Sequence, residues 1–253
     1  MSGFGDVQEP PAAAGKPNKL KTELKAPLFL LTRVSEMDLM GVLTGVQALD
    51  LANADVSDIT ALRTLNTLIT LNLADTQVID ITALETLDAL ESLDLSGTPV
   101  RDLTPLRKCI NLKNLNLART KVEDISILSD LHNLQHLDLE ATKVTDLSPL
   151  ANLQNLEELC LYLTQVADIA PLSGLSQLTK LNLFGTLVLD GTALKTLPSL
   201  ATLDIGGTIL ADVDWENELP GVNVLTSHDH FVWVKDASGV RVDVRLTKRY
   251  PER

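Results

Sequence analysis

The chain has 253 residues, a formal net charge of −13 and a hydrophobic content of 45%. Its longest apolar run covers only residues 26–31, whereas a helix that spans a membrane needs about 20 residues. The acidic excess lies in residues 47–226, which hold 25 acids and 10 bases and would repel a phosphate backbone. These bounds predict a protein that binds neither nucleic acid nor a membrane.

The N-terminal sequence and the two cysteines predict a compartment. Residues 1–19 contain no apolar core of the kind that secretory signals carry, and the C-terminal residues match no lipid-attachment motif. Cys109 and Cys160 lie far apart in the sequence, which favours reduced thiols over a disulfide framework. We therefore expect a cytoplasmic protein.

A single repeat dominates the chain from about residue 46 to residue 226. Two inward aliphatic residues separated by one position recur every 22 residues, eight times without a gap, as Leu49/Leu51, Leu71/Leu73, Leu93/Leu95, Leu115/Leu117, Leu137/Leu139, Leu159/Leu161, Leu181/Leu183 and Leu203/Ile205. The fullest copy begins at Leu68 and reads LxxLxLxxTxVxDIxxLxxLxx. This pattern resembles the 22-residue class of leucine-rich repeats in internalins, in a phosphatase-regulator family and in bacterial cytoplasmic proteins with runs of the type GTxVxDLSPL.

The repeat predicts an α/β solenoid with one short strand per repeat. Because alternate residues of a strand point to opposite faces, Leu71 and Leu73 should point inward while Asn72 lies on the concave side. Parallel stacking at about 4.8 Å would bury leucines that one repeat cannot bury alone. Thr104 before Pro105 predicts a side-chain cap on a short 3₁₀ or α-helical turn of the convex face. The resemblance implies a right-handed leucine-rich-repeat solenoid with a curved parallel sheet.

Two polar residues recur with the same period. An Asp recurs from Asp58 to Asp212, and a Thr recurs from Thr76 to Thr208. A row of carboxylates could bind calcium, but the ligand spacing of a calcium loop is absent. Bonds from each Asp to the amides of a turn or helix start are the favoured interpretation. The Thr stands where the family usually has Asn, and we expect its hydroxyl to bond adjacent turns.

Three segments are predicted along the chain. Residues 1–26 form a basic arm without periodicity, which we expect to be disordered. Residues 27–226 form the solenoid, with an N-terminal cap over 27–46 and a helix near 35–43. Residues 227–253 form a C-terminal β-hairpin cap with a basic tail, because 231–234 and 240–245 alternate like strands around a turn at 236–239. Trp215 and Leu219 are expected to begin this closure.

The chain offers little for catalysis or metal binding. His228 and His230 flank one Asp without a further ligand, so no metal site is predicted. Cys160 belongs to the outward column of the strands, and His136 precedes the equivalent position of the preceding repeat by two residues. No orienting group or oxyanion hole accompanies this pair, and Cys109 replaces a core leucine. We expect neither an enzyme nor a cofactor.

The candidate site lies where the repeats differ. Tyr162 and Phe184 occupy one column directly after the inward strand pair, where other repeats have small residues or Glu140. Exposed aromatic side chains are typical anchors of protein interfaces. The predicted partner-binding site combines these two aromatics with further side chains around them, namely Leu163, Glu140, Asp138, Glu158, Arg119 and His136. The alternative is that the two rings only cover the sheet or pack against each other.

Two functions remain open at this point. The first is a protein–protein interaction module, an adaptor or an inhibitor, that binds a partner with a basic or apolar segment on an acidic concave face. The second is a regulatory subunit of a separate phosphatase or GTPase, which the resemblance permits. We expect a monomer before the partner binds.

Overall fold

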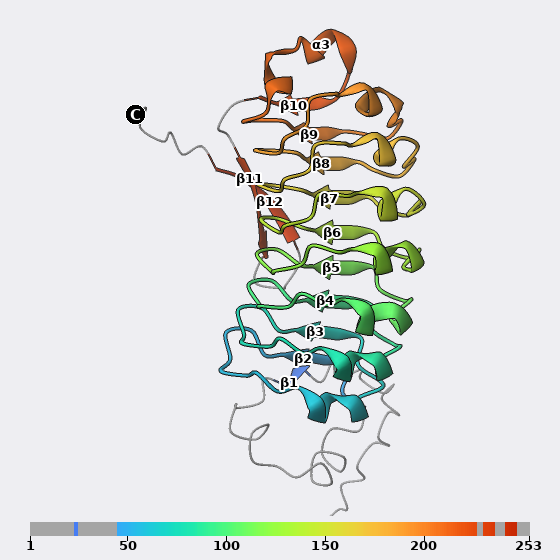
Figure 1. The fold of residues 1–253 in the computed structure, drawn as a ribbon, viewed down its shortest axis with the longest axis vertical. Helices are drawn as coiled ribbons and strands as arrows, with labels where there is room; N and C mark the ends of the chain where they lie inside the picture. The colour runs from blue at the N-terminus through green and yellow to red at the C-terminus, as the bar shows by residue number, and fades with distance from the viewer. Residues whose placement is uncertain (1–22, 25–44, 227–229, 236–240, 247–253) are drawn as a thin grey trace, which may run out of the picture.

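The computed structural model describes residues 23–24, 45–226, 230–235 and 241–246. Within these residues, ten short strands form one parallel sheet in which the strand order follows the sequence (Figure 1). The strands are β1 (Glu23–Leu24), β2 (Ala48–Asp50), β3 (Thr70–Asn72), β4 (Ser92–Asp94), β5 (Asn114–Asn116), β6 (His136–Asp138), β7 (Glu158–Cys160), β8 (Lys180–Asn182), β9 (Thr202–Asp204) and β10 (Asn223–Leu225). Equivalent residues of successive repeats pair directly, as Leu71 does with Leu93, so the 22-residue period sets the register.

A layer of short 3₁₀ turns lies opposite the sheet (Figure 1). The turns are η1 (Thr60–Thr64), η2 (Thr82–Thr86), η3 (Thr104–Lys108), η4 (Ser126–Asp130), η5 (Ser148–Leu150), η6 (Ala170–Leu172), η7 (Thr192–Thr196) and η8 (Ile209–Asp212). A single turn of α-helix, α3 (Trp215–Glu218), follows η8. No helix in this described part of the chain is both long and apolar enough to cross a membrane.

The first seven 3₁₀ turns are capped by the recurring Asp and not by the Ser or Thr that the sequence predicted, whereas in η8 the Thr208 hydroxyl accepts from the Leu210 N–H. In η3, Leu103 occupies the cap position and makes no side-chain cap bond. The backbone N–H of Thr104 instead donates to Asp102 Oδ1 at 2.8 Å. The same 2.8 Å bond recurs in seven turns, from Asp58 in η1 to Asp190 in η7. The prediction that the Asp bonds turn amides is confirmed, and the Ser or Thr becomes the first residue inside the turn.

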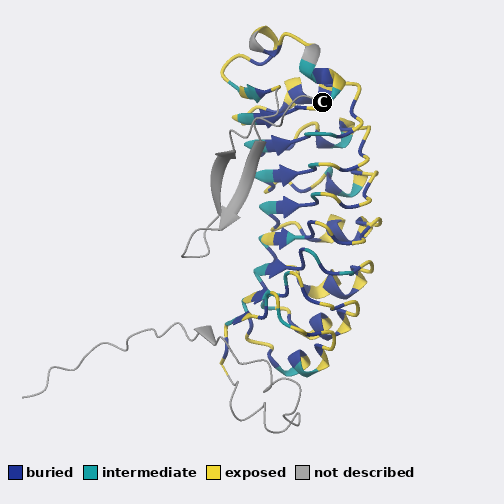
Figure 2. Cartoon of the chain, turned by 90° about the vertical axis from the view of Figure 1, so that its left-hand side faces the viewer, coloured by how far each residue is buried: buried dark blue, intermediate teal, exposed yellow. Residues whose placement is uncertain are grey.

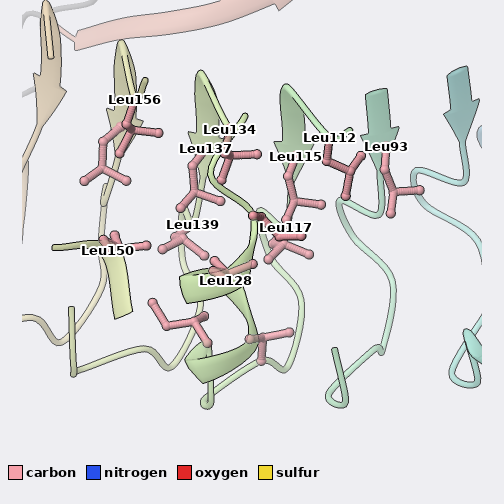
Figure 3. Packing of buried hydrophobic residues seen from close by; sticks show 14 of the residues in the cluster. Leu93, Leu112, Leu115, Leu117, Leu128, Leu134, Leu137, Leu139, Leu150 and Leu156 are labelled. Carbon is pink, nitrogen blue, oxygen red and sulfur yellow. The ribbon is translucent and has the colours of Figure 1, made fainter. Parts of the chain in front are cut away.

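The core fills the space between the sheet and the turns. Buried residues follow the strands and the inner side of the turns, while exposed residues follow the outer side (Figure 2). Figure 3 shows leucines of successive strands, such as Leu93, Leu115 and Leu137, side by side in one row. Each of these three is 1% exposed, which confirms the predicted inward pairs. At about 25 cal/mol per Å² of buried apolar surface, this continuous column supplies the stabilisation that one repeat lacks.

The Thr column is also buried, and its bonds differ from the expectation. Each hydroxyl donates to the carbonyl three residues earlier in its own repeat, as Thr142 does to Leu139 at 2.7 Å, and does not reach an adjacent repeat. The short, branched side chain reaches only the backbone that turns directly beneath it. The bond satisfies a buried hydroxyl that would otherwise cost about 1–3 kcal/mol.

The N-terminal end of the sheet includes part of the predicted disordered arm. Glu23 and Leu24 form β1 and pair in parallel with Ala48 and Leu49. These two residues therefore belong to the sheet, because the free edge of β2 offers unpaired N–H and C=O groups to any neighbouring strand. The rest of the 1–26 arm, the predicted cap over 27–46 up to residue 44 and the helix near 35–43 lie outside the described residues.

At the C-terminal end, Trp215 and Leu219 are 5% and 8% exposed and belong to the core of the solenoid, while their part in the closure stays a prediction. β11 (His230–Lys235) and β12 (Arg241–Leu246) pair antiparallel, as the alternation in the sequence predicted. The turn at 236–239 lies outside the described residues, and the role of the hairpin as a cap stays a prediction.

Candidate functional site

The two aromatic side chains of the solenoid stack on each other. Tyr162 follows β7 and Phe184 follows β8, and their ring centroids lie 5.1 Å apart at an interplanar angle of 19°. The Phe184 N–H donates to Asn182 Oδ1 at 2.9 Å, which fixes the turn after the strand. Both side chains are half-buried. The structure confirms that the two side chains lie side by side in one column. Their binding of a partner stays a prediction.

Leu163 adds a strained apolar side chain beside the pair. Its backbone has φ of 55°, in the left-handed region that an L-residue with a bulky side chain rarely adopts. The side chain is 50% exposed. It leans over Gly185, where an added Cβ would lie 2.7 Å from Leu163 Cδ2. The same left-handed position recurs in every repeat from Asn53 to Gly207 and holds Arg119 and Ala141 as well as glycines, so the fold does not require a leucine here.

A ladder of three polar side chains crosses β6, β7 and β8. Glu158 accepts from Lys180 at 2.9 Å through one oxygen, and its other oxygen lies 3.7 Å from His136 Nε2. His136 Nδ1 is buried without a hydrogen-bond partner among the described residues. Arg119 is directed away from this ladder and lies 3.6 Å from Asp75. The structure thus unites His136 with Glu158 and places Arg119 on a separate ion pair.

Three aspartates of the predicted acidic concave face are buried. Asp94, Asp138 and Asp204 are only 8%, 3% and 2% exposed. Each Oδ1 accepts the N–H two residues later, as Asp138 does from Glu140 at 2.9 Å, so the short side chain folds back along its own strand. Asp138 is therefore part of the buried layer and not of an exposed rim. Burial, followed by the nearby Asp138 charge, raises the pKa of the half-buried Glu140.

Three groups in this region could hold a cation. Ligand atoms of Asp138, Glu140 and Cys160 lie within 4.8 Å of one another. They fall short of the four ligands of a structural zinc site, and Asp138 already accepts a backbone bond. Cys160 lies in the outward column as predicted but is 2% exposed. The other sequence candidate, the pair His228 and His230, has its first member and the intervening Asp outside the described residues.

Cys109 confirms its predicted place in the core. The side chain is fully buried, and Sγ lies 3.6 Å from the Leu84 carbonyl oxygen. Burial, followed by the Asp88 charge, raises the pKa of the thiol to about 11. Neither cysteine forms a disulfide. A thiol of such high pKa stays protonated at neutral pH and is a poor nucleophile.

An apolar area on the flank of the last repeats was not predicted from the sequence. Leu187, Leu189, Ile209 and Val213 are 58%, 66%, 60% and 43% exposed, and they are four of the seven large exposed hydrophobic residues in the described part of the chain. Comparison of the repeats position by position would have found them. The position of Leu187 holds Gln77, Pro99, Lys121, Lys143 and Gln165 in earlier repeats.

The register, the buried leucine column and the 3₁₀ layer define a leucine-rich-repeat solenoid. The model of the family Leucine Rich repeats (2 copies) matches residues 66–108 and 110–152. An internalin (inlF) from Listeria monocytogenes is 30% identical with a TM-score of 0.70, and the match covers 75% of this chain and 56% of that chain. Internalin C2 from the same organism is 32% identical with a TM-score of 0.55, covering 66% of this chain and 82% of that chain.

A more distant likeness concerns the fold alone. The leucine-rich-repeat ectodomain of a plant receptor kinase from Arabidopsis thaliana, solved in complex with Casparian strip integrity factor 2, is 20% identical with a TM-score of 0.55 over 63% of this chain and 21% of that chain. No curated protein sequence matches significantly. The chain belongs to the internalin-like leucine-rich-repeat proteins and is a protein-interaction module.

Proposed function

We propose that the chain binds another protein through the apolar ridge formed by Tyr162, Phe184 and Leu163, as an adaptor or an inhibitor of that partner. The observation that carries the proposal is the half-exposed Leu163 next to the stacked rings, at a surface position where neighbouring repeats have Ala141 and Gly185. Because the left-handed backbone recurs at this position in every repeat from Asn53 to Gly207, the exposed apolar side chain and not the backbone distinguishes Leu163. Aromatic residues are also enriched among the side chains that dominate interface energies.

The polar surroundings of the ridge favour a partner segment that is basic as well as apolar. Glu140 directly precedes Tyr162 in the column, and its raised pKa reflects a carboxylate that has lost solvation. A cationic side chain near Glu140 would restore the lost interaction and stabilise the charged form. His136 and Lys180 already share Glu158, so the ladder supplies less free negative charge than the sequence alone suggested.

The test is affinity capture from the native host lysate, followed by mass spectrometry, with the chain carrying Tyr162→Ala and Phe184→Ala. Alanine is the residue at this column in three other repeats, so the double variant should fold as the wild type does. The matched control removes two exposed apolar side chains elsewhere, with Ile79→Ala and Ile110→Ala; these side chains are 64% and 53% exposed.

We expect the control to retain the captured partner and the aromatic double variant to lose it, with affinity weakened by about tenfold or more. Circular dichroism of both variants checks that the repeats remain folded. Unchanged capture by the folded aromatic variant would overturn the proposal. If the captured partner is an enzyme, assay of the complex separates inhibition from the regulation of turnover.

A further inference from the structure

The flank of the last two repeats departs from the rest of the solenoid in both chemistry and shape. Earlier repeats carry Gln77, Pro99, Lys121, Lys143 and Gln165 at the position of Leu187, and Ile79, Arg101, Glu123, Thr145 and Ala167 at that of Leu189. Both leucines are more than half exposed, while Val188 between them is 1% exposed in the core. Ile209 stands at the position of Leu187 in the next repeat and is 60% exposed. Such adjacent apolar side chains have no packing role in a folded solenoid.

A hollow of about 500 Å³ lies beside these leucines. Its lining is formed by Leu189, by small side chains of two repeats that include Ala167, Ala170 and Ala193, and by Asp168 and Asp190. Two of the small lining residues stand where some earlier repeats have larger ones. Ile127 stands at the position of Ala193 in an earlier repeat, and Ile79 at that of Ala167.

The charged side chains that line the hollow are both acidic. Asp168 and Asp190 are exposed, and each uses Oδ1 to accept the backbone N–H that begins its 3₁₀ turn, at 2.8 Å. Bonds from the hydroxyl and N–H of Thr192 hold the pKa of Asp190 below its usual range, so this carboxylate stays charged. The lining residues include no base, and the nearby Lys195 forms an ion pair with Glu218.

We infer that this flank is a second docking surface, distinct from the Tyr162–Phe184 ridge, for a segment of a partner protein in which an aliphatic side chain lies next to Lys or Arg. The aliphatic group enters the hollow against Leu189, and the cation lies against Asp168 and Asp190. Charge complementarity selects this occupant over an acidic one. The leucines extend beyond the hollow toward the next repeat, which suits a peptide segment more than an enclosed small molecule.

The probe is a displayed library of random peptides of about twelve residues, selected on the wild-type chain. Peptides that also bind a variant with Leu187→Gln and Leu189→Thr are then removed. This variant copies Gln165 and Thr145 of earlier repeats and so keeps the fold. The surviving peptides should pair an aliphatic residue with Lys or Arg. In fluorescence polarisation, their affinity should fall about tenfold on this variant and stay unchanged on the Tyr162→Ala, Phe184→Ala chain.

A charge-neutral variant tests the electrostatic part. Asp168→Asn with Asp190→Asn keeps an oxygen for each turn N–H and removes both charges. We expect weaker peptide binding that no longer depends on salt. The inference is overturned if no peptide survives depletion, if the survivors are acidic, or if wild-type chains self-associate through this flank and lose that association in the leucine variant. Loss of peptide binding only in the aromatic variant would also overturn it, while leaving the ridge proposal intact.

Discussion

Closure of the solenoid at its C-terminal end depends on one glycine and one tryptophan. Six earlier repeats place a large aliphatic residue at the position of Gly191, namely Ile59, Ile81, Leu103, Ile125, Leu147 and Ile169. A Cβ at Gly191 would lie 2.6 Å from Trp215 Cη2, which is closer than real Cβ contacts. The indole of Trp215 therefore occupies the room that an aliphatic side chain fills elsewhere. The two positions should respond to mutation as a pair.

The structure sets the size of each single effect. Gly191→Ile forces its side chain into the indole, and such overpacking costs about 1–3 kcal/mol. The backbone is not the obstacle, because Gly191 has φ −92° and ψ 10°, close to the φ −114° and ψ 18° of Ile125. Trp215→Ala removes a buried ring and its 2.6 Å bond to the Leu210 carbonyl, for a loss of about 3–5 kcal/mol.

In the Trp215→Ala chain, the effect of Gly191→Ile on the free energy of unfolding should reverse its sign. With the indole gone, the isoleucine enters the vacated space and recovers about 1–2 kcal/mol, so Gly191→Ile should stabilise the Trp215→Ala chain while it destabilises the wild type. Urea unfolding followed by circular dichroism measures the cycle. Because repeats couple mainly to their neighbours, hydrogen exchange of residues 200–226 would show local opening of this end. Additive single effects, with no coupling between the positions, would refute the reasoning.

Two further predictions concern buried charge and backbone strain. Burial raises the pKa of Asp204 to about 6 from 3.8, so wild-type stability should fall by up to about 3 kcal/mol as pH rises from about 4 to 7. Asp204→Asn should flatten this fall in urea unfolding, and equal pH dependence in both chains would contradict the expectation. Leu163→Gly should raise the urea midpoint by the equivalent of about 0.5–1 kcal/mol, because it relieves the φ of 55°. A lower midpoint would mean that packing of Leu163 over Gly185 outweighs the strain.

The repeat itself was predictable because its signal is redundant. Eight copies of one aliphatic pair each predict a strand at the same position of the repeat. Because the period is constant, direct pairing of equivalent residues, such as Leu115 with Leu137, follows. The aspartate bonds were also predictable, since a carboxylate commonly binds the N–H two residues later. The identity of the cap was not, because Ser, Thr and Asp are all good caps and only the backbone shows that Leu103 occupies that position.

The electrostatics of the concave side could not be predicted from the positions of the charges. Strand alternation correctly places Asp138 in the outward column, but outward is not the same as exposed. Its side chain folds back to the Glu140 N–H and is 3% exposed. The contacts of Glu158 with both His136 and Lys180 likewise depend on which rotamers the neighbouring repeats permit.

The sequence by itself determined the period, the inward leucine column and the column that holds Tyr162 and Phe184, because each is a statement about position in a regular repeat. Tertiary structure alone decided which of those positions are buried and which charges are shared. The physical reason is that burial, ion pairs and the hollow beside Leu189 depend on contacts between repeats, where side-chain volumes of neighbouring copies meet. The room that Gly191 leaves for Trp215 shows the same dependence, since the two side chains meet only in the folded chain.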